Sequence, residues 1–134
     1  MPAGYFLYGL RILSNIPIPS LSDLSRNHQD NLIDVELRLK EKPRAVPHFS
    51  DSVEIFYSSP HRNAEGDPIL RVGNLDNDRF IFFYSDDLRF SIARDGHEVV
   101  SDWPDDYSLE DAATYLLGPI LGFVLRLRGL RGAG

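Results

Sequence analysis

The chain has 134 residues, no cysteine and a formal net charge of −6 at pH 7. This length allows one domain with a substantial core, and the absence of cysteine excludes disulfides, thiolate zinc sites and cysteine nucleophiles. The acidic balance argues against nucleic-acid binding, because phosphate groups require a basic surface. The most apolar run, residues 112–125, is shorter than the roughly 20 residues of a membrane-spanning helix. We therefore expect a cytoplasmic protein that binds neither nucleic acid nor a membrane.

Two strands are predicted in the N-terminal part of the chain. Residues 5–14 are rich in aromatic and branched side chains, which is typical of a strand. Alternation along that strand would place four side chains on one face, those of Phe6, Tyr8, Leu10 and Ile12. Residues 33–40 alternate between apolar and charged side chains, which is the period of a half-buried strand.

Five further strands are predicted in the middle of the chain. They cover residues 53–58, 69–72, 79–84, 88–94 and 97–102. The last three are predicted to form a meander, because short polar turns separate them. Asp95 and Gly96 make the second of these turns. An Asp-Gly pair between strands is a strong hairpin signal, since glycine readily adopts the positive φ of a type I′ turn.

A single helix is predicted at residues 108–128. Ser108 and Asp111 have the spacing of a capping box, and Pro119 lies inside the helical pattern. Proline removes one backbone hydrogen bond and clashes with the preceding turn, so we expect a kink or two short helices. Residues 129–134 are predicted to be a loose tail.

Together these elements predict an α+β fold that is mainly β. About six or seven mostly antiparallel strands form one meander-rich sheet, and the kinked C-terminal helix packs on that sheet. We expect residues 1–134 to form a single β-rich domain, in which residues 5–103 supply the strands and loops.

The predicted helix carries more apolar surface than one sheet face requires. The apolar stripe on its second half spans roughly 200°, whereas a helix on one core needs a stripe only somewhat above about 100°. Either the sheet or the loop at residues 20–31 covers both sides, or the helix binds another domain or a second copy of the chain. The candidate interface residues are Ile120, Leu121, Phe123, Val124, Leu125 and Leu127.

Two segments of the chain carry a resemblance to a known family. One is residues 114–129, Thr-Tyr-Leu-Leu-Gly-Pro-Ile-Leu-Gly-Phe-Val-Leu-Arg-Leu-Arg-Gly, and the other is Tyr8-Gly-Leu-Arg-Ile with the Pro-Ile-Pro stretch that follows it. The first resembles the helix that leads into the kinase half of bacterial proteins related to HPr serine kinase, and the second resembles the opening of those proteins. The resemblance covers residues 5–129, although residues 22–75 contribute little beyond a strand pattern.

This resemblance implies an accessory or regulatory domain of a serine-kinase-like protein. In that family a P-loop follows the helix, and it binds ATP and magnesium for phosphate transfer to a serine or a small substrate. No G-x-x-x-x-G-K-[ST] motif occurs in this sequence, and the only lysines, Lys40 and Lys42, follow no glycine loop. We therefore expect a non-catalytic fragment whose partner is the missing C-terminal kinase domain, and we predict no catalytic, cofactor-binding or metal-binding residue in this chain.

Two alternatives remain open. The chain is a free-standing binding module that dimerises through its apolar helix, or it is an enzyme whose site is assembled from acidic turns. The acidic turns are Asp76–Asp78 and Asp86–Asp87, and adjacent carboxylates of this kind point in different directions, which disfavours acid–base catalysis. The four histidines lack the spacing of metal ligands; they are His28, His48, His61 and His97.

Overall fold

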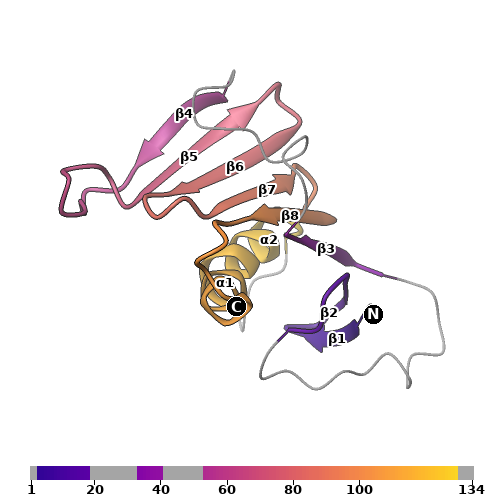
Figure 1. Cartoon of the computed structure of the whole chain (residues 1–134). Coiled ribbons are helices and arrows are strands. Elements are labelled where there is room, and N and C mark those ends of the chain that lie inside the picture. Colours follow the sequence, from indigo (N-terminus) through magenta and orange to yellow (C-terminus); the bar gives the residue numbers. More distant parts are fainter. Residues whose placement is uncertain (1–2, 19–32, 41–52, 130–134) are drawn as a thin grey trace.

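The computed structural model describes residues 3–18, 33–40 and 53–129, which form one β-sheet and one C-terminal helix (Figure 1). The strands are β1 (Ala3–Leu7), β2 (Leu10–Ser14), β3 (Val35–Leu39), β4 (Val53–Ser58), β5 (Leu70–Leu75), β6 (Arg79–Tyr84), β7 (Arg89–Ala93) and β8 (Glu98–Asp102). Their order across the eight-stranded sheet is β1-β2-β3-β8-β7-β6-β5-β4. The helix consists of α1 (Leu109–Tyr115), a π-helical turn (Leu116–Ile120) and α2 (Leu121–Leu127).

The prediction of a mainly β fold with one C-terminal helix is confirmed, but the details of the sheet differ. The sheet has eight strands, and it is mixed rather than mostly antiparallel in its N-terminal part, because β3 pairs in parallel with both β2 and β8. The strands β4 to β8 form the antiparallel meander that the sequence predicts. β3 therefore joins the meander to the N-terminal strands within one continuous sheet.

The segment predicted as one strand at residues 5–14 is a hairpin of β1 and β2. Tyr8 and Gly9 have φ values of 54° and 80°, which is the left-handed backbone that a two-residue type I′ turn requires. The turn places Tyr8 in solvent while Leu10 is buried in the core. The prediction that Tyr8 and Leu10 share a face is therefore wrong, because the chain reverses between them.

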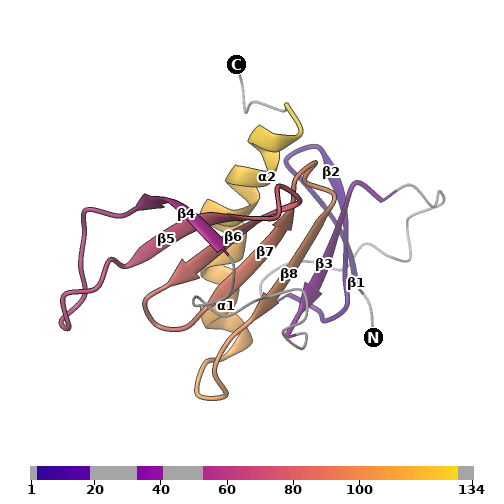
Figure 2. The same cartoon turned by 90° about the horizontal axis from the view of Figure 1, so that it is seen from above.

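The helix lies against one face of the sheet, and the sheet bends around it (Figures 1 and 2). Strands β7 and β8 lie along one side of the helix, and the β1–β2 hairpin reaches another side, where the Tyr8 hydroxyl donates to the Leu117 carbonyl at 3.3 Å. The shared core contains side chains from β1, β2, β3, β7 and β8 and from the helix, including Tyr5, Ile12, Leu37, Phe90, Ile92, Val99, Leu116, Ile120, Leu121 and Val124.

The predicted helix boundaries and cap are confirmed. Ser108 is the N-cap and forms a capping box with Asp111, and Arg128 is the C-cap. Pro119 lies in the π-helical turn that separates α1 from α2, as expected for a residue without a backbone N–H inside a helix. The predicted loop at residues 20–31 and the tail beyond Gly129 lie outside the described residues.

Candidate functional site

The face of the sheet that points away from the helix, which we call the outer face, carries paired charges. In β7, Phe90 and Ile92 pack toward the helix, so Arg89 and Ser91 point to the outer face. Arg89 Nη2 lies 2.9 Å from Asp102 Oδ2, and the two residues are direct cross-strand neighbours. The alternation of side chains along β7 thus places the Arg89 guanidinium group on the outer face, where Asp102 fixes its orientation.

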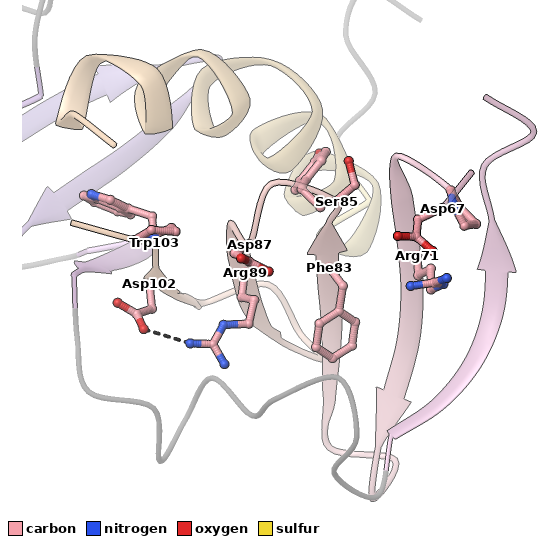
Figure 3. A pocket seen from close by; sticks show the side chains of 11 residues that line it. Asp67, Arg71, Phe83, Ser85, Asp87, Arg89, Asp102 and Trp103 are labelled. Carbon is pink, nitrogen blue, oxygen red and sulfur yellow. Dashed lines mark hydrogen bonds and ion pairs between the residues drawn. The ribbon is translucent and has the colours of Figure 1, made fainter. Parts of the chain in front are cut away.

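A cavity of 690 Å³ lies on the outer face beside this ion pair (Figure 3). Cross-strand pairing aligns Arg71, Phe83 and Arg89 in one row, and Figure 3 shows the Phe83 ring between the two guanidinium groups. Three carboxylates also line the cavity, from Asp67, Asp87 and Asp102.

The composition of this cavity favours a polar ligand that both donates and accepts hydrogen bonds. Guanidinium groups only donate, and ionised carboxylates only accept. Two guanidinium groups and three carboxylates line the cavity. The electrostatic potential in the cavity therefore has no single sign that would favour an anion or a cation. A hydroxyl-rich ligand has both functions and an apolar face that could pack on Phe83.

A second polar cluster lies on the helix side of the sheet, and we call it the tyrosine cluster: Tyr84, Asp86, Tyr107 and Tyr115. Asp86 Oδ2 accepts hydrogen bonds from the hydroxyls of Tyr107 and Tyr115, the latter at 3.1 Å. The rings of Tyr84 and Tyr115 lie 4.5 Å apart between centroids. The β6–β7 turn supplies Asp86, and α1 with its N-terminal flank supplies Tyr107 and Tyr115, so the cluster joins the helix to the sheet.

Burial and the Asp86 carboxylate both raise the pKa values of these tyrosines. For Tyr84 and Tyr115 burial is the main cause, and Asp86 contributes in both cases. For Tyr107 the hydrogen bond to Asp86 is the main cause of the raised pKa. The three hydroxyls therefore remain protonated well above neutral pH.

The structure separates the two carboxylates of the Asp86–Asp87 turn. Asp86 belongs to the tyrosine cluster, whereas Asp87 lines the cavity on the outer face. This agrees with the expectation that the two side chains point in different directions. The Asp76–Asp78 turn is exposed at the far end of β5 and β6, and the structure does not bring it to either site.

The described histidines lie apart from both sites. His61 is exposed in the connection between β4 and β5, and His97 is exposed beside Asp95, to which its ring nitrogen is hydrogen-bonded. His28 and His48 lie outside the described residues. Within residues 3–18, 33–40 and 53–129, no three His, Asp or Glu side chains form a group able to hold a metal ion.

The six candidate interface residues of the helix divide into two sets. Ile120, Leu121 and Val124 are fully buried in the protein's own core. The other three are only half-buried: Phe123, Leu125 and Leu127. Phe123 contacts two phenylalanines of β6, with ring centroids 5.1 and 5.0 Å away. All three half-buried side chains pack against the protein's own core, but they lie on two edges of the buried stripe: Phe123 and Leu127 on one, and Leu125 about 160° away on the other. The bent sheet therefore covers much of the apolar stripe, and a partner would meet only one of these two edges.

Sequence reasoning missed the tyrosine cluster. Tyr107 precedes the N-cap Ser108 and only Tyr115 lies in α1, so no helical spacing in the sequence relates the two tyrosines. Their common partner, Asp86, comes from a turn that only the tertiary fold brings near.

Comparison with known proteins identifies no relative: no family model, curated protein or solved structure matches this chain. In the part of the chain that the structure describes, no helix is both long enough and apolar enough to cross a bilayer.

Proposed function

We propose that this chain is a non-catalytic accessory domain of a serine-kinase-like protein related to HPr serine kinase. The supporting observation is the C-terminal helix, whose apolar surface extends beyond the part that the sheet buries. The segment that most resembles this family, residues 114–129, contains the π-helical turn and α2; the centre of its apolar stripe is buried in the domain, and Leu125 on one edge of the stripe remains half-buried, as do Phe123 and Leu127 on the other edge. A kinase domain that packs against the Leu125 edge would complete the burial of that side of the apolar stripe.

In this proposal the partner domain performs the chemistry. It binds ATP and magnesium through a P-loop and transfers phosphate to a serine or a small substrate, while the present chain positions or regulates it. The chain by itself has no phosphotransfer activity, because its sequence contains no P-loop motif. The need for ATP gives the assembly a cytoplasmic location.

The first test is genetic. The DNA that follows codon 134, read in all three frames, should encode a P-loop within a kinase-like sequence. A locus that encodes no kinase-like sequence, together with a purified chain that binds no such domain, would refute the proposal.

The second test maps the contact directly. The encoded kinase domain is titrated into the isotope-labelled chain, and amide shifts are followed by NMR. We expect shifts concentrated around Leu125, and an affinity weakened by about tenfold or more in Leu125→Glu, because a buried charge lacks a partner. Arg126→Gln is the matched control, since Arg126 is exposed on the same helix and should leave the affinity unchanged.

The cavity on the outer face favours a second candidate, a free-standing ligand-binding module. Its supporting observation is the guanidinium of Arg89, held 2.9 Å from Asp102 at the cavity wall. A screen of neutral polyols by ligand-observed NMR tests this candidate. Saturable binding that is lost in Arg89→Met would favour it, and the absence of any hit would leave the accessory-domain proposal as the better one.

A further inference from the structure

We draw no further inference here: the strongest candidate, the aromatic surface that the exposed Phe56 and Tyr57 of β4 form beside Phe80 of β6, carries nothing, because nothing in the structure shows what covers it.

Discussion

At the scale of single residues, Gly73 is required by the close approach of β4 to β5. A Cβ at this position would lie 2.5 Å from Val53 Cγ1 and 2.8 Å from the Glu54 carbonyl oxygen, and backbone atoms cannot move aside cheaply. We expect Gly73→Ala to lower the free energy of unfolding by about 1–3 kcal/mol, the cost typical of overpacking. Denaturant unfolding measures this change.

Gly122→Ala is the matched control for that measurement. A Cβ at Gly122 meets nothing within 4 Å, and the residue is exposed in α2. Alanine should therefore stabilise the protein by up to about 1 kcal/mol through its better helix propensity. Equal effects of the two substitutions would show that β4 does not lie over Gly73 in solution.

The capping box makes a prediction about pH. Hydrogen bonds from the backbone and side chain of Ser108 lower the pKa of Asp111 from its ordinary value of 3.8. Because the folded state binds the proton less tightly than the unfolded state, the stabilisation is present above pH 3.8 and is lost as the pH falls through the lower folded value. Asp111→Asn should thus be less stable than the native chain at neutral pH.

The difference between the two proteins should shrink as acid protonates Asp111. Urea unfolding of both proteins from pH 7 down to about pH 2 checks this expectation. A difference that stays constant over the whole range would mean that the carboxylate charge has no part in the cap.

At the scale of elements, the tyrosine cluster predicts how the helix responds to alkali. Burial, with Tyr115 and Asp86 adding to it, raises the pKa of Tyr84 above its ordinary value of 10.0, and a group with a raised folded pKa contributes stability that is complete below its unfolded pKa. That contribution should be lost as the pH rises above about 10. Phenolate absorbance and far-ultraviolet circular dichroism should be recorded together. The tyrosines that ionise at the highest pH should do so as the helix separates from the sheet.

Asp86→Asn tests the cause of this alkaline behaviour. The amide weakens the hydrogen bond by which Asp86 mainly raises the pKa of Tyr107, and it removes the charge that adds to the effect, so some tyrosine should ionise at lower pH than in the native chain. An unchanged titration curve would show that Asp86 does not control these hydroxyls.

The elements that local pattern controls were predictable, and those that depend on distant pairing were not. The meander at β6 to β8 follows from alternation and from the Asp95-Gly96 turn, and the helix start follows from Ser108. The reversal at Tyr8 was missed because apolar residues continue through the turn and conceal the break. The parallel pairing of β3 also could not be predicted, because no local feature of its sequence indicates that β2 and β8 would be its neighbours in the sheet.

The candidate sites were less predictable than the fold for the same reason. The negative prediction for acidic turns rested on local geometry, and the structure does direct Asp86 and Asp87 to opposite sides of the sheet. The cavity on the outer face joins residues from β5 to β8, and the tyrosine cluster joins a strand turn to the helix. Neither arrangement has a sequence spacing that reveals it before the strands are placed.

At the scale of the whole molecule, the bent sheet determines how much of the helix a second copy could bind. Ile120, Leu121 and Val124 are fully buried already, which leaves half-buried only Leu125 on one edge of the stripe and Phe123 with Leu127 on the other. A stable dimer commonly buries about 800 Å² on each partner, and three half-buried side chains supply only a fraction of that area. We therefore expect the chain alone to sediment as a monomer at micromolar concentration.

Residue Leu125 tests this expectation directly, because any weak association through the helix at high concentration would use its half-buried edge. Leu125→Glu should reduce any concentration-dependent rise in the sedimentation coefficient, and Arg126→Gln should not. A tight dimer that Leu125→Glu dissociates would contradict the accessory-domain proposal, since the Leu125 edge of the helix would then be occupied by a second copy. It would favour instead the free-standing module that dimerises through its helix.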